Sequence, residues 1–173
     1  MSAASRERTH NYGARLTWRG NRGEGTSNYA SYDRSFSVAV AGKPELALTA
    51  DPAFRGDPAV HNPEDLFLAS LAGCHMLFYL SLCARHGIRV LAYEDEAAGT
   101  MVQDPDGGGR FTEVTLNPVA TIAEGDDEAL ALRLHDTAHE RCFIANSCAV
   151  PIRHQATIHT APAAPPIDGG SGS

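Results

Sequence analysis

The chain has 173 residues, of which 43% are hydrophobic and 20% charged, a composition typical of one globular domain large enough to bury a core. Asp and Glu number 21 against 14 Lys and Arg, so the formal net charge is −7, and the basic residues are scattered. Nucleic-acid binding, which requires clustered positive charge, is therefore not expected.

The ends of the chain differ in composition from the middle. Residues 1–10 are polar and charged, unlike a secretory signal, and we expect a flexible leader there. A single domain is predicted over residues 11–160, followed by a disordered tail over 161–173 that is rich in Pro, Gly and Ser. The expected compartment is the cytoplasm, where four cysteines are more typical of reactive, metal-bound or buried thiols than of disulfides.

Three short strands are predicted first along the chain. Residues 14–18 alternate apolar and polar side chains, residues 35–41 form a second apolar run, and residues 45–49 form a weaker third. Residues 51–61 contain two prolines and a glycine, which predicts a loop, and this loop carries Arg55.

A long apolar helix is predicted from Asn62 to Arg85. Asn62 is a favourable N-cap, Pro63 suits the first helical position, and Gly87 is a typical residue just after a helix end. Residues 66–84 carry no formal charge and reach the length of a membrane span. Because polar residues interrupt this stretch and no second span follows, we expect a central helix buried on all sides instead, with a dimer helping to bury it.

The remaining elements complete a mixed α and β pattern. Residues 90–103 and 110–122 flank the turn-forming segment 104–109 and predict a hairpin. A helix over 126–141 with acidic residues in its first turn and a strand over 152–159 follow. The order β-β-β-α-β-β-α-β predicts an α+β domain with one very apolar central helix.

Two cysteines indicate reversible thiol redox chemistry. Cys74 lies in the long helix, and Cys142 lies at the end of the later one. A thiol that attacks peroxides must be a thiolate, which a nearby guanidinium favours and burial alone opposes. Arg55 is the first candidate for this guanidinium and Arg22 the second, while Glu64 is placed to orient it.

Helix geometry limits how these residues meet. Glu64 and Cys74 are ten residues apart, about 15 Å along a straight helix. Either the helix breaks near residues 72–73 or a neighbouring subunit contributes to the pocket, and we favour the second. Cys83 lies on the opposite helix face from Cys74 and is expected in the core. Cys148 is a spare thiol or an alternative resolving thiol.

A zinc site is a competing interpretation. His135, His139 and Cys142 are spaced to share one helix face, and imidazole and thiolate are zinc ligands, with Cys148 or His154 as a possible fourth. Surface histidines on a polar helix face are the alternative explanation of the same spacing.

The motifs resemble those of one known family. Asn62-Pro63-Glu64, then Cys74 ten residues after the Glu, and a second cysteine in Cys142-Phe-Ile-Ala-Asn-Ser147 resemble the OsmC/Ohr hydroperoxide-reducing proteins, over residues 16–159. Residues 51–57 resemble the OsmC-like branch. The resemblance implies the OsmC-like fold as an intertwined homodimer, with apolar central helices covered by sheets and two active sites at the interface.

The resemblance also implies the chemistry. Cys74 would be the peroxidatic thiol and Cys142 the resolving thiol, with Arg55 and Glu64 as the activating pair. We therefore expect an oxidoreductase that reduces organic hydroperoxides to alcohols through a Cys74 sulfenic acid and a Cys74–Cys142 disulfide, without metal or other cofactor. A dithiol, of the lipoyl type, would recycle it.

The sequence also predicts an apolar pocket beside Cys74 and leaves two kinds of activity to be distinguished. Apolar residues around Cys74 predict a preference for organic peroxides over hydrogen peroxide, because alkyl groups gain free energy by burial. The residues expected to line that pocket are Phe67, Leu71, Met76 and Phe78. The alternative from another class is a redox sensor or binding protein that keeps the fold and the thiols but does not turn over.

Overall fold

The computed structural model describes residues 8–163, and the chain divides into two compact units, Met1–Leu66 and Phe67–Ser173. Most of the leader predicted over 1–10 and of the tail predicted over 161–173 lies outside the described residues, and the single domain predicted over 11–160 stays a prediction. Each unit is described here by itself.

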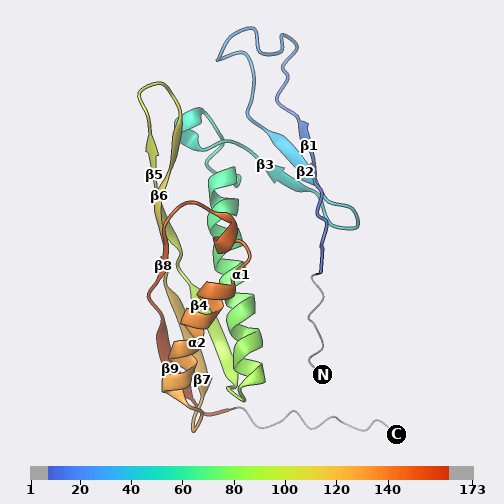
Figure 1. Cartoon of the computed structure of the whole chain (residues 1–173). Coiled ribbons are helices and arrows are strands. Elements are labelled where there is room, and N and C mark those ends of the chain that lie inside the picture. The colour runs from blue at the N-terminus through green and yellow to red at the C-terminus, as the bar shows by residue number, and fades with distance from the viewer. Residues whose placement is uncertain (1–7, 164–173) are drawn as a thin grey trace, which may run out of the picture. The chain divides into compact units, whose positions relative to one another are not determined.

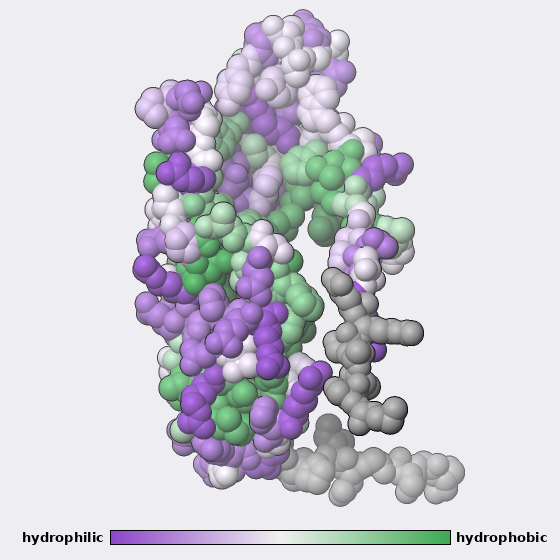
Figure 2. Space-filling view, in the orientation of Figure 1, coloured by the Kyte–Doolittle hydropathy of each residue, from purple (hydrophilic) through white to green (hydrophobic). Residues whose placement is uncertain are grey.

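The first unit contains a three-stranded antiparallel sheet with the order β1-β2-β3. Its strands are β1 (Arg15–Trp18), β2 (Phe36–Ala39) and β3 (Leu46–Leu48). Each strand end lies within two residues of the end that the sequence predicts. Figure 2 shows apolar surface on this unit. Its strands carry three large exposed side chains: Leu16, Trp18 and Leu46. A single turn of 3₁₀-helix, η1 (Pro52–Phe54), interrupts the predicted loop.

Helix α1 (Pro63–Arg85) has the predicted ends. At its start the Asp65 N–H donates to the Asn62 side chain at 2.8 Å, and the Asn62 N–H donates to the Asp65 carboxylate at 3.2 Å. This reciprocal pair satisfies two N–H groups that would otherwise lack partners. At its end Gly87 adopts a left-handed conformation with φ 76°, which terminates the helix.

The second unit contains two three-stranded sheets beside α1 (Figure 1). One has the order β4-β7-β9 and the other the order β5-β6-β8. Their strands, in chain order, are β4 (Val90–Asp95), β5 (Ala98–Gln103), β6 (Gly109–Leu116), β7 (Pro118–Ala123), β8 (Ile152–His154) and β9 (Thr157–Ala161). Each of the three long strands predicted after α1 is thus divided between the two sheets, and the α+β class is confirmed.

Asn117 and Pro118 give the physical reason for the division between β6 and β7. The Asn117 N–H donates to the Asp95 carboxylate and its side-chain amide donates to the Glu96 carbonyl, both at 2.8 Å. These bonds connect the short segment between β6 and β7 to the short segment between β4 and β5. Pro118 has no N–H to offer a continuous ladder, so the chain changes sheet here.

Helix α2 (Glu128–Arg141) begins at Asp127, whose carboxylate accepts from the Leu130 N–H at 2.8 Å. One face of this helix packs into the core, with Leu134 and Ala138 buried. A second short 3₁₀-helix, η2 (Ala145–Ser147), follows α2.

Helix α1 packs on both sheets through two groups of buried residues. Leu71 lies against Val114 and Leu116, and Tyr79 lies in a core that includes Ala120 and Ile122. The rest of α1 is less covered: the helix is long and apolar enough to cross a membrane, but only 28% of an 18-residue stretch of it is buried within the chain. The single chain therefore does not bury α1 on all sides, and the contribution expected from a dimer stays a prediction.

Candidate active site

The structure brings two sequence-predicted residues together, Cys74 of α1 and Cys142 at the end of α2. Cys74 is half-buried, whereas Cys142 is fully buried, and the two thiols are close enough for Cys74 to raise the pKa of Cys142. The position of Cys142 is set by the end of its helix, because its N–H donates to the His139 carbonyl at 3.3 Å. All four cysteines of the chain are free thiols.

The two thiols of this pair differ in their surroundings. Burial, with a smaller contribution from the neighbouring Cys74 thiol, raises the pKa of Cys142 to about 11. Cys142 therefore holds its proton at neutral pH and is shielded from solvent. Cys74 is the thiol of the pair that a solute can approach, since it lines a surface pocket.

This pocket beside Cys74 is apolar. It has a volume of about 320 Å³ and is lined by Cys74, Leu77, Phe78, Ser81 and Phe143. The rings of Phe78 and Phe143 meet edge to face with their centroids 5.0 Å apart. Of the four residues predicted to line the pocket only Phe78 does so: Phe67 and Leu71 lie nearer the start of α1, where they pack with Val114 and Leu116, and Met76 is on another face of the helix. An alkyl or aromatic group is the chemical class that such a lining accepts.

Arg55 and Glu64 belong to the first unit, whereas both thiols belong to the second. Arg55 is exposed, has φ 69°, and lines a polar cavity of about 450 Å³ together with Arg34, Ser35 and Asp57, among others. Its guanidinium lies 5.8 Å from the centroid of the Tyr29 ring. Among the described residues it forms no salt bridge.

Glu64 lies in the first turn of α1, and its Oε2 atom is buried without a hydrogen-bond partner among residues 8–163. Because α1 is continuous from Pro63 to Arg85, the break considered near residues 72–73 is wrong, and Glu64 and Cys74 are separated by about 15 Å along one helix. Glu64 does not reach the Cys74 thiol of its own chain.

Arg22 is engaged elsewhere. Its Nε donates to the Asp33 carboxylate at 2.8 Å, and its Nη2 forms a second contact with the other carboxylate oxygen. This two-point pairing fixes the guanidinium in the first unit. Arg55 is thus the candidate whose guanidinium is not already paired with a carboxylate.

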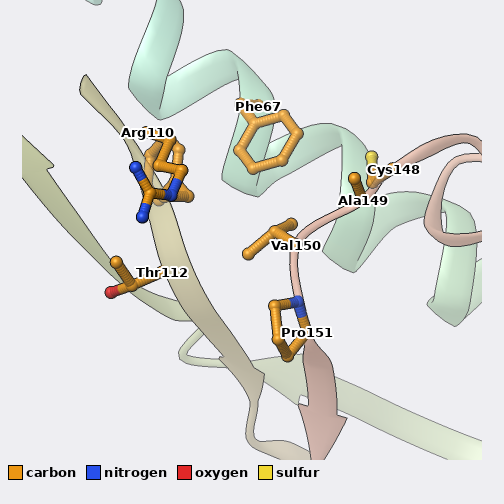
Figure 3. A pocket seen from close by; sticks show the side chains of 8 residues that line it. Phe67, Arg110, Thr112, Cys148, Ala149, Val150 and Pro151 are labelled. Carbon is orange, nitrogen blue, oxygen red and sulfur yellow. The ribbon is translucent and has the colours of Figure 1, made fainter. Parts of the chain in front are cut away.

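The other two cysteines lie apart from the pair. Cys83 is in the core, where burial raises its pKa. Cys148 donates to the Ile144 carbonyl at 3.2 Å and lines a different pocket of about 490 Å³. Figure 3 shows Phe67 of α1, Arg110 and Thr112 of β6, and Val150 around this second pocket.

The zinc interpretation is overturned. No group of three or more His, Cys, Asp or Glu within residues 8–163 has the geometry to hold a metal ion. The spacing fails because the three side chains do not share one face: the ring of His135 stacks on Tyr79 with centroids 3.7 Å apart, while Cys142 follows the end of the helix and turns to Cys74.

Sequence reasoning missed a buried pair of histidines. His75 and His135 are fully buried, and His75 Nε2 lies 3.0 Å from His135 Nδ1. The sequence interpretation placed His135 either on a metal or on the surface, and both alternatives are wrong. A signal was present, because His135 shares a helix face with the apolar Ala131 and Ala138, which are also buried.

Comparison with known proteins identifies relatives of this architecture. Residues 56–156 match the family described as OsmC-like protein. An OsmC-like protein of unknown function from Vibrio cholerae is 28% identical with a TM-score of 0.77, covering 86% of this chain and 99% of that one.

Two further solved structures share the fold. An organic hydroperoxide resistance protein from Elizabethkingia anophelis is 20% identical, with a TM-score of 0.64 and coverage of 90% of this chain and 100% of its own. One from Legionella pneumophila is 18% identical, with a TM-score of 0.63 and coverage of 88% and 99%. No curated protein matches the chain.

Proposed function

The chain belongs to the OsmC-like protein family, and from this premise we propose that it is a thiol-dependent peroxidase that reduces organic hydroperoxides to alcohols. The observation that carries the proposal is the pairing of an accessible Cys74 with a buried Cys142 beside an apolar pocket. The fold relatives named for organic hydroperoxide resistance support the same class of reaction.

The first step takes place at Cys74. Its sulfur, as the thiolate, attacks the distal peroxide oxygen, so that an S–O bond forms while the O–O bond breaks. The alkoxide leaves as an alcohol after taking a proton, and Cys74 becomes a sulfenic acid. The apolar lining from Leu77, Phe78 and Phe143 holds the organic part of the substrate.

The second step joins the two sulfurs. The Cys142 sulfur attacks the Cys74 sulfur, an S–S bond forms, and the hydroxyl of the sulfenic acid leaves as water with the proton of Cys142. A dithiol then reduces the disulfide by exchange, and a lipoyl-type dithiol in the cytoplasm is the proposed reductant. The reach between the two side chains supports this step.

A homodimer completes the proposed site. Helix α1 leaves Leu66, Ser70 and Leu77 exposed on one face and Gly73 between them half-buried. A second copy of this helix would cover that face with an apolar surface of the same length. Because Glu64 is about 15 Å from Cys74 on its own helix, Arg55 and Glu64 act across the subunit interface in this proposal.

Turnover tests the proposal against the sensor alternative. Purified protein is mixed with cumene hydroperoxide in the presence of excess dihydrolipoamide, and peroxide consumption is followed over time. A peroxidase consumes many equivalents per thiol pair, and Cys74→Ser consumes none above background. Consumption of one equivalent followed by arrest would favour the non-turnover redox sensor instead.

A further inference from the structure

Helices α1 and α2 are joined inside the second unit by the buried pair His75–His135. The Nε2 of His75 lies 3.0 Å from the Nδ1 of His135, and the ring planes are inclined by 10°. Both residues are fully buried. On α1 the pair is extended by Tyr79, whose ring stacks on His135 at a centroid distance of 3.7 Å.

The pair lies on the same two helices that carry the redox thiols. His75 follows Cys74 directly in α1, and His135 is seven residues before Cys142, about 10 Å along the axis of α2. A change in the separation of α1 and α2 at the histidines therefore moves the two sulfurs relative to one another. Apolar side chains of the two helices also pack in a shared core, and the bond between the rings is the polar contact that fixes their separation at this point.

The bond between the rings requires neutral imidazoles. One nitrogen donates its proton and the other accepts, which two imidazolium ions cannot do. Burial, with a contribution from neighbouring histidines, lowers the pKa of His75 to about 4 and that of His135 to about 3, so both are neutral at pH 7.

Other titratable groups surround the pair on several elements. They are Tyr79 of α1, Asp136 and His139 of α2, Tyr93 of β4 and His154 of β8. The one carboxylate among them, Asp136, lies 3.3 Å from His154 Nε2 and does not pair with His75 or His135. Within residues 8–163, the outer nitrogens of the pair, His75 Nδ1 and His135 Nε2, have no hydrogen-bond partner. The contact between the two rings is thus the polar interaction that the pair makes.

We propose that His75 and His135 are positioning residues for the resolving step, holding α1 and α2 at the separation from which Cys142 closes the disulfide on Cys74. The inference rests on the proposed function for its place in a catalytic cycle. It predicts that loss of the bond slows disulfide closure and leaves the attack of Cys74 on peroxide unchanged. A displacement of about 1 Å is enough to slow a step of this kind by about 10²-fold.

Amide side chains of two lengths distinguish the position of the polar atom from the loss of the ring. Gln places a polar atom near the position of Nε2 of His, and Asn places one near Nδ1. His75→Gln and His135→Asn therefore keep the contact and are called the matched variants, whereas His75→Asn and His135→Gln move the polar atom away, with the same change in polarity, and are called the displaced variants. His86→Gln, at an exposed histidine after α1, is the control.

The two chemical steps are measured separately in each variant. One equivalent of cumene hydroperoxide is added without reductant, and samples are quenched with dimedone, which traps the sulfenic acid, before intact-mass analysis. Displaced variants are expected to close the disulfide about 10–100-fold more slowly and to accumulate the trapped adduct. Matched variants and His86→Gln are expected to close within about 3-fold of the wild type, with equal rates of peroxide attack in all.

A second measurement does not depend on peroxide. The Cys74–Cys142 disulfide is equilibrated in glutathione buffers, and displaced variants are expected to form it less readily than matched ones. Equal closure rates and equal glutathione equilibria in folded matched and displaced variants would overturn the inference. Failure of wild-type peroxide turnover would instead refute the proposed function, while the glutathione comparison would still test the histidine pair.

Discussion

The Cys142 thiol, fully buried at the end of α2, lies close enough to the half-buried Cys74 thiol in α1 for that neighbour to raise its pKa. The difference in burial predicts a different role for each of the two sulfurs. The accessible sulfur meets the peroxide, and the shielded one, whose pKa burial raises to about 11, reacts after Cys74 has been oxidised.

Replacing each thiol in turn is expected to give a distinct product. Without reductant, Cys74→Ser gains no oxygen from cumene hydroperoxide. Cys142→Ser stops at the Cys74 sulfenic acid and then proceeds to the sulfinic acid, because no second thiol closes the disulfide. Intact-mass analysis distinguishes these products. Cys148→Ser, at the separate pocket shown in Figure 3, is expected to behave as wild type. Loss of the disulfide only in Cys148→Ser would transfer the resolving role to that residue.

Arg55→Ala is expected to slow oxidation of Cys74 by about 10²-fold, since it removes a charge-assisted donor from the reacting peroxide and thiolate. Arg55→Lys keeps the charge but loses the planar fork, so an intermediate rate is expected. The rate is measured as loss of alkylatable Cys74 under excess peroxide. Arg22→Ala is the matched control, because Asp33 already holds that guanidinium. The reverse order of effects would assign activation to Arg22.

The apolar pocket is expected to determine substrate preference. Phe143→Ser reduces the apolar lining, which lowers kcat/KM for cumene hydroperoxide by about 5–30-fold, equivalent to about 1–2 kcal/mol of lost burial. The rate with hydrogen peroxide, which has no alkyl group, is expected to stay within about 2-fold. Leu91→Ser, at an exposed leucine of β4 outside the pocket, is the control. A wild type that handles hydrogen peroxide better than cumene hydroperoxide would refute the preference itself.

A dimer is expected in solution, because α1 leaves Leu77 65% exposed on an apolar stripe. Sedimentation velocity is expected to give the mass of two chains. Leu77→Arg places a charge in the proposed helix contact and is expected to shift the protein toward the monomer. Leu132→Arg, at an exposed leucine of α2, controls for the added charge. A wild type that sediments as a monomer at micromolar concentration would contradict the proposal.

Acid is expected to destabilise the protein through its buried histidines. The pKa of His75 falls from 6.5 to about 4 on folding, and that of His135 to about 3, mainly through burial. Below pH 6.5 the unfolded chain binds protons that the folded chain does not, so this part of the stability is present above pH 6.5 and is lost as the pH falls toward 4 and 3. For His75 alone the loss is about 3 kcal/mol.

Urea unfolding between pH 7.5 and pH 4.5 measures this dependence. The free energy of unfolding of the wild type is expected to fall with pH, and His75→Gln, which has no titrating ring, is expected to show a shallower fall. His86→Gln is the control, since that histidine is exposed. An unfolding free energy independent of pH over this range, or an identical slope in His75→Gln, would contradict the assignment.

Local signals in the sequence were sufficient for most element boundaries. Asn62 and Gly87 delimit α1 as predicted, because caps act through bonds within a few residues of the chain. The division of the later strands was not predictable in the same way. It depends on bonds from Asn117 to the turn after β4, made between segments that become neighbours only in the folded sheet.

The sequence by itself determined the α+β class, the ends of its helices and the family motif, since each is encoded in the spacing of neighbouring residues. The structure places Cys142 beside Cys74, as the family motif implies. Tertiary structure alone decided that His135 faces His75 rather than a metal or solvent, and that Cys148 lies at another pocket. The physical reason is that side-chain burial and the distance between two helices depend on packing across the core, to which residues remote in sequence contribute jointly.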